Sequence, residues 1–257
     1  MIYLLGHKGF LGSAIENYLK ENKLEYEGID RENYDEFTST SCDIFINANG
    51  NSKKWLAEKD PAADFQMNVA ATLKTIFDFK IGKYVFISTI DVYNDTQNTE
   101  NNSEDATIVQ DRLSNYGFHK YTAEQIVRKY CKKWIILRFG GLVGAGLKKN
   151  QVFDILKTGN IFVSSESRYQ YLNTRDAAAI VGKLLELENE VINVCGDGTI
   201  SISEAANHAG VKLDENEKKK DFYDVNIEKL KSLVHVPKTK DTVFRFIDDV
   251  RNRKVEI

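Results

Sequence analysis

The sequence predicts an α/β protein built on a doubly wound parallel sheet. Short apolar strands without polar alternation alternate along the chain with helical segments, which is typical of strands buried on both faces. The chain has 257 residues, enough for one large core with a smaller attached lobe. A glycine-rich turn directly follows the first strand, at the end of the sheet where such folds bind ligands.

The expected elements follow from the apolar patterning. Strands are predicted where short apolar runs occur, at residues 2–5, 25–29, 43–47, 83–88, 134–139 and 191–194. Helices are predicted where the apolar residues recur at helical spacing, at residues 13–21, 61–79, 116–130 and 176–187. A third strand of the sheet is expected within residues 33–42, but this segment is too polar to show where the strand lies.

Two segments fall outside this alternation of strands and helices. Residues 94–115 are a polar insertion rich in Asn, Asp and Glu, and the chain from about residue 197 carries mixed charge, including the run 215–220. We therefore expect a sheet domain and a small C-terminal substrate lobe. The sheet domain would comprise residues 1–145 and 172–196, and the lobe residues 146–171 and 197–257.

Composition argues against several classes of function. The formal net charge is -3 at pH 7, so no basic surface supports binding to nucleic acid. The longest apolar runs are too short to span a membrane. A strand is expected from residue 2, so we expect no cleaved leader and a cytoplasmic protein. The three cysteines form no CxxC motif, so reduced thiols are expected and a metal site is not.

The first strand leads into Gly6, Gly9 and Gly12, and an amphipathic helix follows. In such a turn the first glycine permits the tight bend, the second lets the backbone approach a pyrophosphate, and the third lets helix pack on strand. The N-terminus of the helix would offer N–H groups to the anion, and Phe10 and Leu11 in the turn would also contact the cofactor. The sequence therefore predicts a Rossmann-like dinucleotide site.

The choice of cofactor depends on the end of the second strand. Asp30 lies about 20 residues beyond the glycines, where a carboxylate accepts hydrogen bonds from the ribose hydroxyls and repels a 2′-phosphate. This favours NAD. Arg31 follows directly and could instead receive that phosphate, so NADP stays open.

Tyr116 and Lys120 are four residues apart in a predicted helix, hence on one face. A phenol with a pKa near 10 is a poor base at neutral pH. An ammonium about 4 Å away would contribute roughly 4 kcal/mol at an effective dielectric near 20, which would lower the tyrosine pKa by about three units. Tyr116 could then exchange a proton with an alcohol oxygen.

Together these motifs resemble an extended short-chain dehydrogenase/reductase of the NAD-dependent epimerase/dehydratase family. The resemblance covers nearly the whole chain in the order of the family. YGFHK matches the Y-x-x-x-K of the family, and GHKGFLG its GxxGxxG. Six other segments of the chain resemble further elements of the family: INANGNS, MNVAAT, FISTIDVY, LRFGGLVGAG, YLNTRDAA and INVCGDGTISISE.

The resemblance implies a role for each matching position. Thr89 would hydrogen-bond the substrate oxygen, Tyr116 would be the acid/base, and Lys120 would lower the pKa of that tyrosine and hold the nicotinamide ribose. Asn47 and Ala48 would border the cofactor. Members of this family mostly act on nucleoside diphosphate sugars, so such a sugar is the expected substrate, while a homodimer stays open.

Departures from the family pattern narrow the expected reaction. Dehydratases of the family carry an Asp-Glu pair after the catalytic threonine, whereas this chain has Ile90 and Asp91. Dehydration is therefore disfavoured, and Asp91 is expected to contact substrate. The nearest guanidinium groups for a diphosphate are Arg168 and Arg175. We expect an NAD(P)-dependent epimerase or 4-ketoreductase.

Two alternatives remain at this point. The chain could be an oxidoreductase of another small alcohol or ketone, or a non-catalytic dinucleotide-binding regulator. Such regulators keep the glycine turn but lose the tyrosine and lysine, and both are present here.

Overall fold

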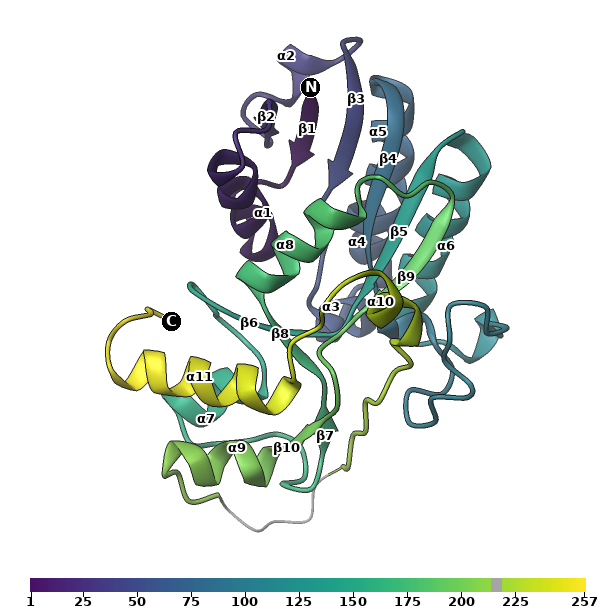
Figure 1. The fold of residues 1–257 in the computed structure, drawn as a ribbon. Helices are drawn as coiled ribbons and strands as arrows, with labels where there is room; N and C mark the ends of the chain where they lie inside the picture. Colours follow the sequence, from purple (N-terminus) through teal and green to yellow (C-terminus); the bar gives the residue numbers. More distant parts are fainter. Residues whose placement is uncertain (214–218) are drawn as a thin grey trace. The chain divides into compact units, whose positions relative to one another are not determined.

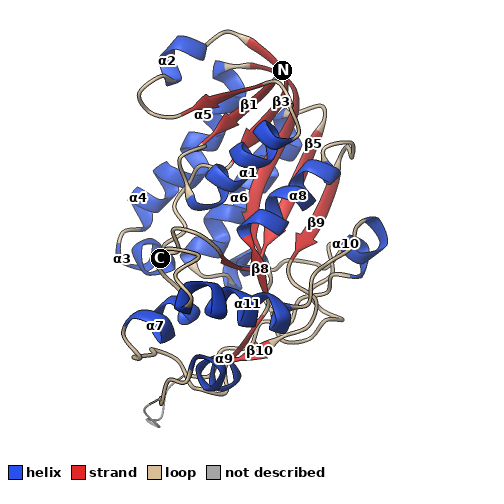
Figure 2. Cartoon of the chain, turned by 60° about the vertical axis from the view of Figure 1, so that its left-hand side comes forward, coloured by secondary structure: helices blue, strands red, loops and turns tan. Residues whose placement is uncertain are grey.

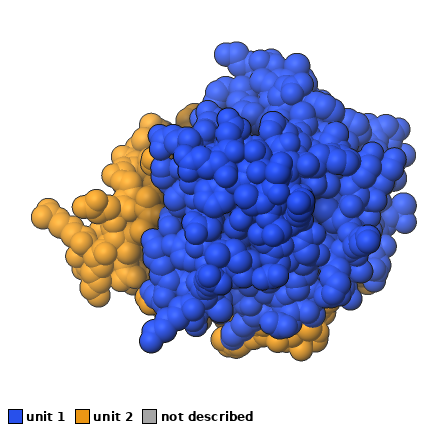
Figure 3. All heavy atoms as spheres, turned by 90° about the horizontal axis from the view of Figure 1, so that it is seen from above, with its two compact units in different colours: residues 1–94, 104–139, 178–192 blue, residues 95–103, 140–177, 193–257 orange. Residues whose placement is uncertain are grey.

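The computed structural model describes residues 1–213 and 219–257, so most of the charged run 215–220 lies outside the described residues. The chain divides into two compact units, which Figure 3 colours separately. Unit 1 comprises residues 1–94, 104–139 and 178–192, and unit 2 comprises residues 95–103, 140–177 and 193–257. Over the described residues, no helix is long and apolar enough to cross a membrane.

Unit 1 is built on a six-stranded sheet with the strand order β2-β1-β3-β4-β5-β9 (Figure 1). The four pairings from β2 to β5 are parallel, which confirms the predicted α/β class. The strands are β1 (Ile2–Leu5), β2 (Tyr26–Ile29), β3 (Ser41–Asn47), β4 (Lys80–Thr89), β5 (Trp134–Phe139) and β9 (Glu190–Val194). In register, Leu5 pairs with Ile29 on one side and Asn47 on the other, so the ends of these strands lie level.

Helices cover both faces of this sheet (Figure 2). One face carries α1 (Phe10–Glu21) and α8 (Thr174–Leu184), which touch where Gly182 meets the ring of Tyr18. The other carries α5 (Ala71–Asp78) and α6 (Asn115–Tyr130), which pack on each other and on β4. The shorter segments of unit 1 are α2 (Tyr34–Phe37), α3 (Lys54–Lys59), α4 (Pro61–Phe65) and the turns η1 (Gln66–Ala70), η2 (Ile90–Val92) and η3 (Gln110–Arg112).

The helix predicted at residues 61–79 is one continuous helical run with a π turn, η1, in its middle. Pro61 begins it, and the Asp60 side chain accepts a hydrogen bond from the backbone N–H of Ala63 at 2.9 Å. This is the usual start of a helix, because proline lacks the N–H that would otherwise be left without a partner. The π turn contains Asn68, which is buried.

Residues 33–42 hold no separate strand; they form the short helix α2 before β3 begins at Ser41. The strand predicted at residues 43–47 is therefore the third in the chain, and the expectation of another strand before it is wrong. Tyr34 and Phe37 at the ends of α2 pack partly against the sheet core. A helical turn brings two aromatic rings to the same side, so a short polar segment still closes this end of the core.

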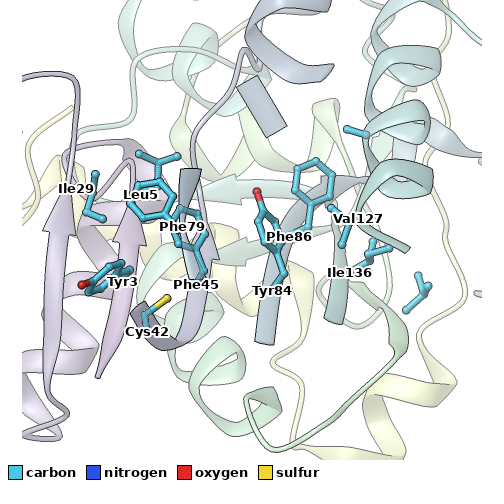
Figure 4. Packing of buried hydrophobic residues seen from close by; sticks show 12 residues of the cluster. Tyr3, Leu5, Ile29, Cys42, Phe45, Phe79, Tyr84, Phe86, Val127 and Ile136 are labelled. Carbon is cyan, nitrogen blue, oxygen red and sulfur yellow. The ribbon is translucent and has the colours of Figure 1, made fainter. Parts of the chain in front are cut away.

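The core between the sheet and α5–α6 is rich in aromatic side chains (Figure 4). The rings of Phe45 and Tyr84, on neighbouring strands, stack at 5.4 Å between centroids. The buried Tyr84 hydroxyl bonds to Thr75 Oγ1 at 2.7 Å and to Asn47 Nδ2 at 2.8 Å. A buried phenol thus meets its hydrogen-bonding requirement inside an apolar layer.

Unit 2 contains short strands and helices, with β6 pairing β8 in parallel and β7 pairing β10 antiparallel. Its polar segment 95–103 is anchored by the fully buried Asn102, which accepts from Asn226 N–H and donates to the carbonyl of Asp224. The elements are β6 (Gly141–Val143), α7 (Gln151–Lys157), β7 (Arg168–Tyr169), β8 (Tyr171–Asn173), β10 (Ile200–Ser201), α9 (Ile202–Ala209), α10 (Glu228–Leu233) and α11 (Thr239–Arg251).

Candidate active site

The glycine turn after β1 is packed so tightly that side chains cannot enter it. Gly6 has a φ of +83°, and a Cβ there would lie 3.0 Å from the backbone of Ala48. A Cβ on Gly12 would lie 2.0 Å from the carbonyl oxygen of Gly6. Gly9 precedes α1 without a side-chain cap, and the first turn of α1 carries no acidic residue. The first N–H groups of α1, beginning at Phe10 and Leu11, thus fit an anionic pyrophosphate.

Asp30 follows β2 directly, where the sequence predicts a ribose-binding carboxylate. Its carboxylate forms an ion pair with Lys8 and accepts the Glu32 N–H at 2.8 Å. The hydrogen bond from Lys8 and the backbone bond from Glu32 lower the pKa of Asp30 to about 2, so this group is charged at any working pH. Arg31, the competing candidate, is exposed.

Asn47 and Ala48 lie at the end of β3, level with the glycine turn. The Asn47 side chain is 2% exposed and is engaged with Tyr84, while its Oδ1 accepts the Asn49 N–H at 3.1 Å. Ala48 N–H donates to the Leu5 carbonyl at 3.0 Å. Asn47 therefore fixes the loop after β3, and a cofactor contact from either residue stays a prediction.

Tyr116 and Lys120 both lie on the first turns of α6, whose Ser114 cap accepts the Gly117 N–H at 3.1 Å. Both side chains are buried. The Lys120 ammonium donates to the Ile87 carbonyl at 2.7 Å and lies 4.2 Å from the centre of the Phe86 ring. Burial lowers the pKa of Lys120 to about 8.

The pKa of Tyr116 departs from the sequence prediction. Burial and, next, the charge of Asp91 raise the pKa of this phenol above its ordinary value. The largest opposing influence is the charge of Lys54 rather than that of Lys120. The expected lowering by Lys120 is therefore wrong for this structure, because Lys120 is directed at the Ile87 carbonyl.

Thr89 ends β4, and its hydroxyl is hydrogen-bonded to Asp91. It donates to Asp91 Oδ2 at 2.9 Å and accepts the Asp91 N–H at 3.2 Å. Asp91 in turn accepts from the Lys54 ammonium at 2.6 Å. The structure thus brings the predicted residues Thr89, Asp91 and Tyr116 together. It adds Lys54, which nothing in the sequence singled out.

A buried charged network behind the site was also missed. Arg138 on β5 donates from two nitrogens to the carboxylate of Glu124, at 3.0 and 2.7 Å, and from a third to the Tyr93 hydroxyl at 2.9 Å. Glu124 also accepts from Ser88. Burial lowers the pKa of Arg138, but Glu124 and Tyr93 together more than offset this and raise the pKa overall. An arginine inside an otherwise apolar strand, and an acid four residues after Lys120, were the available signals.

A second missed network joins α4 to α6. His119 Nδ1 lies 2.7 Å from Asp64 Oδ2, and both side chains are buried. The other carboxylate oxygen accepts from Asn51 and Asn68, at 2.6 and 2.9 Å. The signal was a polar stripe at helical spacing, formed by Asp64, Asn68 and Thr72, within a helix expected to pack on the sheet.

The two candidate diphosphate ligands belong to unit 2, whereas Tyr116 belongs to unit 1. Arg168 is 38% exposed at its side chain, donates to Thr199 Oγ1 at 3.0 Å and lies 3.5 Å from Glu204. Arg175 is exposed on the first turn of α8. A role for either residue in binding substrate stays a prediction.

Comparison with known proteins identifies the family. A sequence model of the NAD dependent epimerase/dehydratase family matches residues 2–196, which is more than half of the chain. The chain belongs to this family and is an NAD(P)-dependent enzyme of the extended short-chain dehydrogenase/reductase type. No curated protein matches the sequence.

Solved structures share the fold at low identity. A UDP-galactose 4-epimerase superposes with a TM-score of 0.79 at 19% identity, covering 98% of this chain and 99% of the other. A dTDP-4-dehydrorhamnose reductase from Bacillus anthracis, in complex with NADP, gives 0.77 at 19% identity, covering 96% and 98%. A UDP-glucuronic acid 4-epimerase from Bacillus cereus, in complex with UDP-glucuronic acid and NAD, gives 0.78 at 18%, covering 97% and 99%.

Proposed function

We propose that this protein is an NAD(P)-dependent nucleotide-sugar epimerase or 4-ketoreductase with Tyr116 as its acid/base. The observation that carries the proposal is the place of Tyr116, which is buried on the first turn of α6, the helix that packs on β4, the strand that ends in the buried Thr89. These side chains lie in the same unit as the glycine turn and Asp30. The sugar class rests on the family and on the epimerases and the reductase that share the fold.

The glycine turn fits the cofactor, since no side chain caps the start of α1 at Gly9 and no acidic residue lies in its first turn. When bound, NAD(P) supplies the hydride acceptor or donor. Asp30 would accept from the ribose hydroxyls, and the first N–H groups of α1 would bind the pyrophosphate. Lys120, charged below its pKa of about 8, would donate to the second ribose.

Tyr116 would move a proton to or from the sugar oxygen. Its raised pKa keeps the phenol protonated at neutral pH, which is the form that can protonate a ketone oxygen. Arg168 and Arg175 are the candidate partners of the diphosphate. NAD and NADP both suit the family, and the charge on Asp30 favours NAD.

Replacing Tyr116 tests the proposal directly. Tyr116→Phe should keep the fold and cofactor binding while turnover of a UDP- or dTDP-sugar falls by at least about 10²-fold, the scale of a lost general acid/base. Turnover is measured against a panel of UDP- and dTDP-sugars and their 4-keto forms, and cofactor binding by fluorescence titration. The exposed Tyr130 on the same helix gives the matched control, Tyr130→Phe. Full activity in Tyr116→Phe contradicts the assignment.

A further inference from the structure

His7 lies in the glycine turn with its imidazole between two carboxylates from different parts of unit 1. Its Nδ1 lies 3.3 Å from Glu16 Oε2 on α1, and its Nε2 lies 3.5 Å from Asp30 Oδ2, just after β2. All three side chains are largely buried, with exposed fractions of 15% to 19%. The ring therefore connects the helix that follows the glycine turn to the carboxylate that we expect to bind the ribose.

The imidazole is kept in this place by its close packing on Gly28 of β2. A Cβ on Gly28 would lie 2.7 Å from His7 Nδ1 and 2.9 Å from His7 Cγ. The ring thus rests on bare backbone, and any larger residue at position 28 would displace it. This close approach gives a reason for a glycine inside a strand, where glycine is otherwise unfavourable.

The position of both ring nitrogens matches one protonation state of the imidazole. An imidazolium can donate from both nitrogens, whereas a neutral ring has one N–H and one lone pair. His7 Nδ1 is buried and forms no hydrogen bond with the described residues, so water cannot replace Glu16 as its partner. In a neutral ring the single proton is therefore needed at Nδ1, and Nε2 then turns a lone pair toward Asp30.

Other titratable groups reach this site from the glycine turn, from α1 and from β2 with the loop after it. They are Lys8 in the turn, Glu16 and Lys20 on α1, Tyr26 on β2, and Asp30 and Glu32 after β2. Burial alone would raise the pKa of Glu16, but its contacts, first with Lys20 and then with Tyr26, lower it overall. The pKa of Asp30 is about 2. Histidine is the residue type in this set whose charge ordinarily changes between about pH 5 and pH 8.

We propose that His7 is a positioning residue for the cofactor, whose imidazolium bridges Glu16 and Asp30 and fixes the Asp30 carboxylate for the adenosine ribose. Loss of the imidazolium proton turns a lone pair toward Asp30 and releases the carboxylate. NAD therefore binds more tightly while His7 is protonated. This inference rests on one part of the proposed function, the contact of Asp30 with the ribose, and does not depend on the sugar.

A double-mutant cycle on NAD binding, followed by fluorescence titration at about pH 6, tests the bridge. His7→Gln should weaken NAD binding by about three- to fivefold, the scale of an ion pair near the surface. In the Asp30→Ser background the same exchange should have no further effect, because the bridge is already lost. Equal weakening in both backgrounds would show that His7 only shapes the turn, and overturns the proposal. His208→Gln, which removes a histidine 3.0 Å from Asp248 in unit 2, is the control and should leave NAD binding unchanged.

The pH profile of NAD binding gives a second readout, which a purely structural role of His7 would not change. The difference in affinity between the wild type and His7→Gln should be largest near about pH 5.5 and should close by about pH 8, because the wild-type ring is then neutral. Both proteins keep Lys120, so its titration affects both curves alike. A difference that stays constant with pH overturns the proposal. If His7→Gln fails to fold, Gly28→Ala displaces the ring and keeps the histidine, and it should weaken NAD binding in the wild type but not in Asp30→Ser.

Urea unfolding at about pH 6 tests the bridge without any cofactor. The losses of stability in His7→Gln and Asp30→Ser should sum to more than the loss in the double variant, because each exchange removes the same contact. Additive losses overturn the bridge. If the losses are coupled but Asp30→Ser binds NAD as tightly as the wild type, the cofactor role of both residues is overturned and the fault lies in the ribose assignment. Absence of turnover with every nucleotide sugar would end the sugar assignment alone, since none of these measurements uses a sugar.

Discussion

At the scale of single residues, neighbouring charges decide what each candidate group can do. Tyr116 and Lys120 are both buried. Burial and then the charge of Asp91 raise the pKa of the Tyr116 phenol. Burial lowers the pKa of the Lys120 ammonium, and the charges of Glu124 and Asp64 oppose this change. Spacing in the sequence placed Tyr116 and Lys120 on one helix. It could not find Lys54, which reaches Asp91 from a separate helix 37 positions earlier. Contacts of that kind depend on tertiary packing.

Asp30 gives a prediction at this scale. Its pKa of about 2 keeps it charged, so it should repel a 2′-phosphate equally at all working pH values. Asp30→Ser should weaken binding of NAD and should narrow or reverse the preference of the protein for NAD over NADP, because the carboxylate is gone and Lys8 loses one of its two ion-pair partners. Both cofactors are titrated against each protein by fluorescence. Glu32→Gln removes the other carboxylate near Lys8, at 3.3 Å, and serves as the control. A wild type that already prefers NADP contradicts the assignment of Asp30.

At the scale of elements, the strands were predicted better than what connects them. The run of apolar residues in β1 and β5 was enough to place their bounds, which agree with the structure. The helix at residues 61–79 was also expected, but its π turn was not. The spacing of apolar residues in the sequence does not reveal that one turn of a helix contains an extra residue. The helix α2 was missed because a single turn is too short to show a period.

Gly12 gives a prediction for the packing of α1 on β1. In an ordinary helix, alanine would be favoured over glycine by about 1 kcal/mol. Here a Cβ would lie 2.0 Å from the Gly6 carbonyl, so we expect Gly12→Ala to lower the free energy of unfolding by about 2 kcal/mol, the scale of overpacking. Urea unfolding measures this. Ser13→Ala, one residue on, loses only a 3.3 Å hydrogen bond and is the control. A stabilised Gly12→Ala protein would mean that the turn is not tight.

At the scale of the whole molecule, the sequence predicted the parallel sheet because its strands are apolar throughout and its glycine turn stands at a fixed place. The buried pairs of Asp64 with His119 and of Glu124 with Arg138 were not predicted. Each pair joins two different elements, so the partners are known only once those elements are packed. An isolated charge in such a core would be strongly destabilising. These pairs therefore help to specify how α4, α6 and β5 fit together.

Lys120 makes the stability of the folded chain depend on pH. Its pKa falls from 10.5 to about 8, so between these values the unfolded chain holds a proton that the folded chain has released. Stability contributed by this group therefore rises with pH across that window, and below about pH 8 its burial costs roughly 3 kcal/mol. Lys120→Met removes this cost but also the bond to the Ile87 carbonyl, worth about 1 kcal/mol. The variant should be more stable than wild type by about 1–2 kcal/mol near pH 7.

The advantage of Lys120→Met should shrink as the pH approaches about 10, because wild-type Lys120 is then neutral in the folded chain. Urea unfolding of both proteins across about pH 7–10 measures the difference. Lys129→Met, at an exposed lysine of the same helix, shows what the exchange of lysine for methionine does by itself. The decisive observation is how the stability difference changes with pH. A gain in stability that stays constant with pH would mean that better packing, rather than the removal of a buried charge, stabilises the variant. A variant less stable than wild type near pH 7 would place the ammonium in a net favourable site and contradict the lowered pKa.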